Sequence, residues 1–269
     1  MSVFSGDFLG ITLGEVHSSQ LNITRVSSGD RYDDNLLPNF KDVTAEVPGG
    51  DGMYFWDTFY NQKPFVLNFA YDDLRDEDLR RLRQVFGFKG VQPLIFDEFP
   101  YKKYMVKCVA PPTFKYICFD HMEMRLYKGE GSANLVAYYP YALATFSPKI
   151  ENVSWGLINN IGDLTAKISV IYDINTAMGL STIELRDLKG NSLGIMGFEE
   201  ISKQGENDKY ILIDSYTHLI EGLDENFNKT GHLYNKFNTS GTFFGAPLGR
   251  TRFESNVPFV RLEYTPLYY

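Results

Sequence analysis

The side chains best suited to metal or nucleophilic chemistry, four histidines and two cysteines, are scattered along the chain. The histidines are His17, His121, His218 and His232. Neither H-E-x-x-H nor C-x-x-C spacing occurs, so a zinc site would have to be assembled from distant residues. His121-Met-Glu123 matches the first half of a zinc deaminase signature, but the P-C-x-x-C that should follow is missing. We therefore predict no metal site.

The two cysteines also indicate structure rather than catalysis. Cys108 and Cys118 lie in apolar, alternating segments, a setting typical of buried structural cysteines. One G-x-S-x-G match, Gly190-Asn-Ser-Leu-Gly194, lies in the second half of the chain, where no helix is expected, so it lacks the helix of a nucleophile elbow. Neither G-x-x-x-x-G-K-S/T nor G-x-G-x-x-G after a strand occurs. These absences argue against hydrolase and nucleotide chemistry, and we predict no cofactor.

Paired carboxylates are the remaining candidates for catalysis. Asp97-Glu98 and Glu199-Glu200 are adjacent in the sequence, and neighbours on a strand point to opposite faces, so neither pair can flank one bond. The acidic turn formed by Asp30, Asp33 and Asp34 lacks the full EF-hand spacing and is interpreted as a solvated loop. We predict no catalytic residue, and thus no enzyme.

The elements that would have to position any site are mainly β-strands. Short β-branched or aromatic segments are bounded by Gly, Pro, Asn and Asp along most of the chain, which is typical of an all-β protein. The expected strands include residues 21–26, 65–69, 104–109, 116–119, 166–172, 182–185, 210–214 and 258–264.

One segment has the pattern of a helix, which we expect over residues 74–86. Leu79, Leu82 and Phe86 recur at helical spacing, and Asp73 is placed to cap the first turn. Acidic residues gather at the start of this segment, whereas Arg80, Arg81 and Arg83 follow toward its end, as the helix dipole favours. The arginines are interpreted as a solvated face, with a specific anion site as the alternative.

Two prolines, Pro140 and Pro148, separate two runs of strands. We place a domain boundary near 143–150, which gives domains over 1–145 and 150–269. In the second half, Gly or Asn residues typical of turns recur at short intervals and no convincing helix is present, which suggests a β-sandwich.

The segment Tyr54–Tyr60 holds five aromatic residues in seven positions. In a single half-buried strand, alternation would leave some of these rings exposed, so part of this surface is expected to contact another subunit. A monomer core is the alternative. We select Tyr54, Phe55, Trp56 and Phe59, together with Arg80 and Arg83 on the helix face, as candidate subunit-interface residues.

Charge and hydropathy exclude further classes of function. The formal net charge of −8 disfavours tight binding to nucleic acid across a broad face, so no sequence-specific nucleic acid partner is expected. The longest apolar stretch, Leu135 to Phe146, is interrupted by Pro140 and is shorter than the roughly 20 residues that span a bilayer. The residues after Met1 do not resemble a secretory leader, so we expect synthesis and folding in the cytoplasm, without membrane insertion.

Several local patterns, taken in order, resemble the distal tail protein (Dit) family of siphophages. Val47-Pro-Gly-Gly-Asp-Gly52 is followed by Pro64-Phe-Val-Leu-Asn-Phe69, the acidic-to-basic helix, and Pro93-Leu-Ile-Phe-Asp-Glu-Phe-Pro-Tyr101. Tyr139-Pro-Tyr-Ala142 and the closing Gly241-Thr-Phe-Phe-Gly-Ala-Pro-Leu-Gly249 fit the same family. Gly50 departs from it, because a basic residue is expected in that turn.

The resemblance implies a structural protein of the virion tail tip or baseplate, assembled in the host cytoplasm. Its N-terminal domain would be a ring-forming β-sandwich or split barrel with one helix, and its C-terminal domain a galectin-like β-sandwich at the periphery. The chain would form a homo-hexameric ring, alone or as a back-to-back double ring, through which DNA passes. Its partners would be the tail tube protein, the hub or tail-associated lysin and, in some phages, receptor-binding proteins.

Two other classes stay open at this stage. A carbohydrate-binding β-sandwich of a tail fibre or baseplate would use an aromatic platform with polar side chains, and Trp155, His218 and His232 are the candidates in the second half. A cell-wall-degrading enzyme is the other alternative, although it lacks a recognisable carboxylate or metal constellation.

Overall fold

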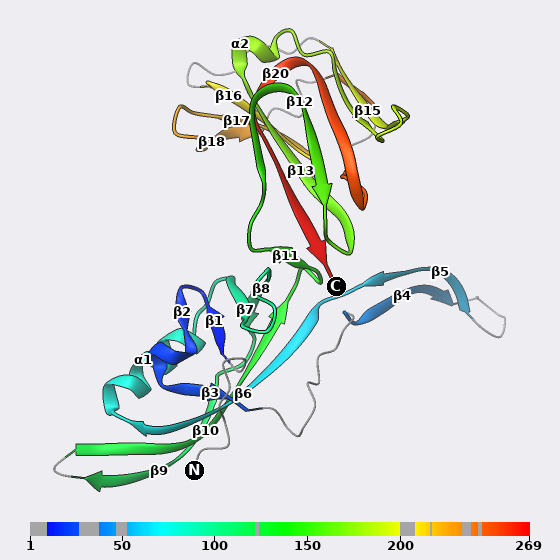
Figure 1. Cartoon of the computed structure of the whole chain (residues 1–269). Coiled ribbons are helices and arrows are strands. Elements are labelled where there is room, and N and C mark those ends of the chain that lie inside the picture. Colours follow the sequence, from blue (N-terminus) through cyan, green and yellow to red (C-terminus); the bar gives the residue numbers. More distant parts are fainter. Residues whose placement is uncertain are drawn as a thin grey trace. The chain divides into compact units, whose positions relative to one another are not determined.

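The structure, a computed structural model, describes residues 10–26, 38–46, 53–121, 124–199, 208–215, 217–232, 238–241 and 244–269. It is mainly β, as predicted, and it divides into two compact units (Figure 1). The first unit comprises Met1–Thr145 together with Tyr269, and the second comprises Phe146–Tyr268.

The first unit is organised around two long strands, β6 (Lys63–Leu74) and β10 (Met124–Ala137), which pair antiparallel along most of their length. Strand β3 (Ile23–Arg25) extends the sheet beside β6. Beside β10 lie β9 (Thr113–His121) and β8 (Lys102–Cys108), with β11 (Ala142–Ala144) paired to β8. The sheet continues through β7 (Gln92–Phe96), β1 (Ile11–Leu13) and β2 (Val16–His17), which is followed by a 3-10 turn at Ser18–Leu21.

The predicted helix is present as α1 (Asp76–Phe86), although it begins two residues later than expected. Leu74 still belongs to β6, and Asp73 adopts a left-handed backbone conformation with φ of 57°. The N-cap is therefore Arg75 and not Asp73, and the Arg75 backbone amide donates to the Asp78 carboxylate at 3.0 Å. The prediction that Asp73 caps the helix is wrong, because Asp73 still belongs to β6 and lies two residues before the N-cap.

The buried face of α1 carries the three residues predicted for it, Leu79, Leu82 and Phe86. The Phe86 ring stacks on Phe69 of β6, with centroids 4.8 Å apart and an interplanar angle of 11°. Helical spacing therefore identified the face that packs on the sheet.

The second unit consists of two curved layers joined through the long pair formed by β12 (Lys149–Asn160) and β20 (Gly249–Tyr268). The first half of β20 continues into β14 (Thr182–Arg186), β15 (Ser192–Glu199) and β19 (Asn238–Gly241). The second half of β20 pairs with β13 (Leu164–Asp173), and β16 (Tyr210–Asp214), β17 (Leu219–Leu223) and β18 (Lys229–His232) follow in order.

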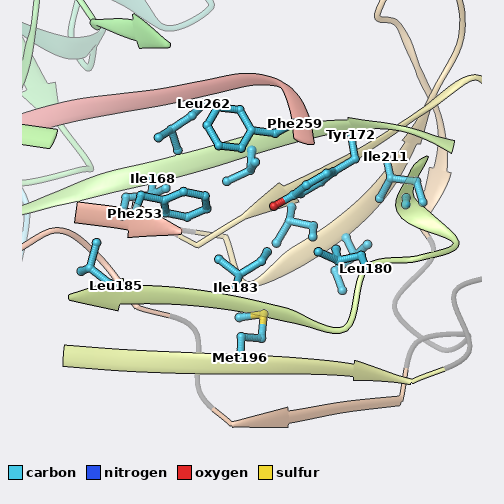
Figure 2. Close-up of a cluster of buried hydrophobic side chains, with 14 of the residues drawn as sticks. Ile168, Tyr172, Leu180, Ile183, Leu185, Met196, Ile211, Phe253, Phe259 and Leu262 are labelled. Carbon is cyan, nitrogen blue, oxygen red and sulfur yellow. The ribbon is translucent and has the colours of Figure 1, made fainter. Parts of the chain in front are cut away.

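Side chains from both layers meet in one apolar core. Figure 2 shows Tyr172, Phe253 and Phe259 among aliphatic residues of the opposing strands, and all three rings are buried. A short helix, α2 (Ile174–Ala177), also contributes to this core. The sequence did not indicate α2, because four residues are too few to show helical periodicity.

Candidate functional site

Strands β4 (Phe40–Glu46) and β5 (Met53–Tyr60) form a two-stranded sheet separate from the main sheet. We call these two strands the aromatic ribbon. Figure 1 shows the ribbon extending away from the rest of the first unit. Its register runs from Phe40 opposite Tyr60 to Glu46 opposite Met53, with an irregularity that leaves Trp56 without a directly paired residue.

Both faces of the ribbon are exposed. Successive side chains on a strand point to opposite faces, so a strand covered on one side would bury every second ring. Instead Tyr54, Phe55, Trp56 and Phe59 are 61, 63, 71 and 44% exposed. The ribbon also exposes Phe40, Val43 and Met53. An isolated two-stranded ribbon is at best marginally stable in water, so this surface is suited to gaining a partner.

Aromatic contacts fix the base of the ribbon to the first unit. The Tyr60 ring lies 5.3 Å from that of Phe40 on the partner strand, and 5.8 Å from that of Tyr141 in an edge-to-face arrangement. Farther along, the Thr58 hydroxyl donates to the Asp42 carboxylate across the strands at 2.5 Å. These contacts set where the ribbon leaves the unit and leave its rings available.

Arg80 and Arg83 lie elsewhere. Both are exposed on one flank of α1, beside its buried residues, and Figure 1 shows α1 and the ribbon well apart within the first unit. The structure therefore brings Tyr54, Phe55, Trp56 and Phe59 together on one element but does not bring the two arginines to them. The six residues form two separate candidate surfaces.

The Asp97-Glu98 pair is split between two different partners. The His17 imidazole lies 3.0 Å from the Asp97 carboxylate, whereas the Glu98 carboxylate pairs with Arg25. Among the described residues, no group of three or more His, Cys, Asp or Glu side chains is placed to hold a metal ion. Asp30, Asp33, Asp34 and Glu200 lie outside the described residues, as do Met122 and Glu123.

The prediction that both cysteines are buried is wrong. Cys118 is exposed on β9, and Cys108 is only partly buried on β8, where its thiol donates to the Ala110 carbonyl at 3.0 Å. Strand β9 forms a hairpin with β10, and most of its described residues are exposed. Apolar alternation indicates a strand, but it does not establish that a second layer covers it.

One arrangement of polar side chains was not foreseen. The sequence showed no charged residue that would lie beside Trp155. In the structure Trp155 contacts Arg252 on the neighbouring strand. Arg252 in turn belongs to a group of ion-paired side chains on the same sheet of the second unit. Alternation within each strand could have shown which residues point outward, but not which strands lie side by side.

Comparisons with known families and structures agree with this architecture. Residues 16–128 match the model of the phage tail protein RIFT-related domain. The Dit protein of phage SPP1, described as a paradigm of hub adsorption apparatus in phages infecting Gram-positive bacteria, has a TM-score of 0.60 at 12% identity. That match covers 97% of this chain and 99% of the SPP1 protein.

Two structures of the phage P2 baseplate in its activated conformation also match, one with Ca and one with Sr. Their TM-scores are 0.41 and 0.43, each at 9% identity. The matches cover 91% and 96% of this chain, and 90% and 97% of those chains. No curated protein matches the sequence.

The matched segment lies within the first unit, which is therefore the part of the chain that is similar to the phage tail protein RIFT-related domain. The match over residues 16–128 and the similarity in fold to the SPP1 Dit protein agree with the resemblance to siphophage distal tail proteins noted in the sequence. Among the described residues, no helix is both long and apolar enough to cross a membrane.

Proposed function

We propose that this protein is a structural ring subunit of the phage tail tip, and that the aromatic ribbon of each copy lies against the neighbouring copy. The ring, six subunits in the family pattern, would join the tail tube protein to the hub or tail-associated lysin and let DNA pass. Receptor-binding proteins would be additional partners. The observation that carries this proposal is the exposure of Tyr54, Phe55, Trp56 and Phe59 on both faces of one projecting ribbon.

Physical chemistry favours a head-to-tail contact between copies. A ribbon on one side of a subunit that binds a different surface on the next makes a heterologous interface, which closes into a ring when the rotation permits. Burying one aromatic side chain removes roughly 150–250 Å² from water, at about 25 cal/mol per Å². Several rings together would offset the cost of ordering the ribbon against its neighbour.

The charge of the chain is compatible with DNA passage. Every copy adds a formal −8, and like charge reduces adhesion between a protein surface and the phosphate backbone. A channel lined with Lys and Arg side chains in the assembled ring would contradict this part of the proposal.

The test is the mass of the full-length chain in solution, measured by light scattering across a range of concentrations. The wild-type chain should give a closed oligomer near six subunits, whereas Trp56→Asp should give a monomer, because the variant would bury an uncompensated carboxylate in the contact. The matched control is Trp155→Asp, which changes the other tryptophan, exposed in the second unit, and should leave the mass unchanged.

Two results would contradict the proposal. An unchanged oligomer in Trp56→Asp would remove the ribbon from the subunit contact. A wild-type chain that stays monomeric at high concentration, and also when mixed with its tail tube and hub proteins, would argue against ring formation itself.

A further inference from the structure

The outer face of one sheet in the second unit carries an ordered row of polar and aromatic side chains. Directly opposed residues of antiparallel strands point to the same face. Across the four strands β12, β20, β14 and β15, the register aligns Trp155 with Glu254, Glu254 with Glu184, and Glu184 with Ile195. The next row aligns Leu157 with Arg252, and Arg252 with Arg186. We call Trp155, Leu157, Glu184, Arg186, Arg252 and Glu254 the Trp155 face.

Buried side chains on the opposite side of the same strands support this face. The residues that alternate with it, among them Ile158, Leu185 and Phe253, are buried in the core of the second unit. Figure 2 shows Leu185 and Phe253 within that core. A well-packed inner face restrains the backbone that carries the outer one, so the outer side chains start from fixed positions.

The charged side chains of the face form one connected network. Arg252 Nε lies 2.6 Å from Glu254 Oε1, and Arg186 Nε lies 3.2 Å from Glu254 Oε2. Arg186 Nη2 donates to Glu184 Oε2 at 2.6 Å, and Arg186 Nη1 donates to the Gly190 carbonyl at 3.1 Å. Two guanidinium groups and two carboxylates are thus oriented by one another, and their formal charges cancel.

An aromatic ring adjoins this network. The Arg252 guanidinium lies 4.9 Å from the centroid of the Trp155 ring, which is half exposed. The face therefore offers a flat apolar plate beside fixed donors and acceptors. Carboxylates and guanidinium groups have more hydrogen-bonding capacity than one partner uses, so this network can also bond a ligand.

We propose that the Trp155 face binds a neutral saccharide, with the apolar side of one sugar ring on Trp155 and its hydroxyl groups on the Arg252, Glu254, Arg186 and Glu184 side chains. Each sugar hydroxyl both donates and accepts, which matches a surface that presents guanidinium donors and carboxylate acceptors side by side. This inference is independent of the proposed ring, because it concerns only the second unit.

The charge balance separates this ligand class from others. A polyanion would meet Glu184 and Glu254, and a polycation would meet Arg186 and Arg252, without net attraction in either case. The centre of a protein–protein contact is usually depleted of glutamate, whereas Glu184 and Glu254 lie at the centre of this face. The hydroxyl groups of a neutral ligand can donate to the carboxylates and accept from the guanidinium groups, so the ligand can bond to both kinds of side chain.

The test uses the full-length chain with Trp56→Phe, which leaves Trp155 as its single tryptophan. Its fluorescence should change in a saturable way on titration with one or more of glucose, galactose, rhamnose, N-acetylglucosamine and N-acetylgalactosamine. A glycan array of neutral oligosaccharides extends the search to longer ligands. On that array Trp155→Ala should lower binding by roughly tenfold or more, because it removes the central aromatic contact.

Matched variants separate recognition from folding. Arg252→Lys keeps the charge but loses the planar donor group, so it should weaken the same saccharide by about tenfold. Met178→Ala, at an exposed side chain of the second unit outside the Trp155 face, should leave array binding unchanged. Circular dichroism of every variant should match the wild type, since all these side chains are at least partly exposed.

Several outcomes would overturn the proposal. One is the absence of binding to every neutral glycan on the array together with a Trp155 emission that no sugar changes. Another is binding that survives Trp155→Ala, or binding confined to acidic glycans. A purified tail protein that binds the chain through Trp155, while no glycan does, would assign the face to a protein contact instead.

Discussion

The aromatic ribbon and the core of the second unit are built from similar residues and have opposite surroundings. Phe253 and Phe259 lie on a strand and are buried, as is Tyr172, whereas Phe55 and Trp56 lie on a strand and are largely exposed. Aromatic residues favour strands in both places. The difference is that a second layer of strands covers the core residues, while both faces of the ribbon are left open within its own subunit.

This comparison separates two uses of aromatic side chains. In the core, burial stabilises the fold of one chain. On the ribbon, the same apolar area is still available, and its burial would stabilise an assembly. Substitutions should therefore affect stability in one region and association in the other.

The sharpest way to break the comparison is to truncate one ring in each region. Phe253→Ala should lower the free energy of unfolding of the second unit by about 3–5 kcal/mol, because it opens a cavity in a packed core. Phe55→Ala should change the stability of the monomer by no more than about 0.5 kcal/mol. Urea unfolding, followed by the fluorescence of Trp155 in a Trp56→Phe background, measures the first value. Circular dichroism at a concentration where the chain is monomeric measures the second.

Equal losses for the two variants would mean that the ribbon packs within its own subunit. That result would remove the basis for assigning the ribbon to a contact between copies.

A smaller effect on stability should come from Lys167, a partly buried side chain on β13. Burial lowers the pKa of Lys167 from its usual 10.5 to about 8, and the charge of Asp214 opposes this only in part. The unfolded chain then holds this proton more tightly than the folded chain does. Stability should therefore rise with pH between about 8 and 10.5, by roughly 1 kcal/mol once solvent screening is taken into account.

Lys167→Met should abolish this rise, because the variant has no proton to lose at that position. Urea unfolding of both chains at pH 7.5 and pH 10 isolates the contribution of Lys167, since other titrating groups are common to the two. The same slope in both chains would show that water reaches the ammonium group freely.

The smallest effect on stability should come from the arginines of α1. Arg80→Gln with Arg83→Gln should change the free energy of unfolding by no more than about 0.5 kcal/mol, because both side chains are exposed. If this face also meets a neighbouring copy, the double variant should weaken the oligomer by less than about tenfold, and the loss should shrink at high salt. Arg81→Gln, on the same helix, is the matched control.

A normal oligomer in the double variant at low salt would restrict the contact to the ribbon. Light scattering at two salt concentrations measures the mass of the oligomer and so tests this outcome.

Local patterns predicted much of the secondary structure. The strands expected over 65–69, 166–172 and 210–214 lie within or coincide with β6, β13 and β16, because β-branched and aromatic alternation is a property of neighbouring residues. The face of α1 formed by Leu79, Leu82 and Phe86 was predicted for the same reason. The start of α1 was predicted two residues too early, because hydrophobic periodicity does not show that Asp73 adopts a left-handed backbone conformation.

Long-range neighbours could not be predicted in this way. The alignment of Trp155 with Glu254 and Glu184 depends on which strands pair and in what register, and no local pattern specifies either. The exposure of Cys118 was missed because burial depends on what covers a strand. The assignment of Tyr54, Phe55, Trp56, Phe59, Arg80 and Arg83 to a subunit interface stays a prediction.

The position of β20 has a consequence for how the second unit is made. This strand pairs with β12, β13 and β14, and so it links both layers, yet it follows all of them in the sequence. During synthesis, the strands that precede it leave the ribosome without their shared neighbour. The sandwich can therefore close only after Gly249–Tyr268 has emerged, and until then its apolar inner surfaces remain open to aggregation or to a chaperone.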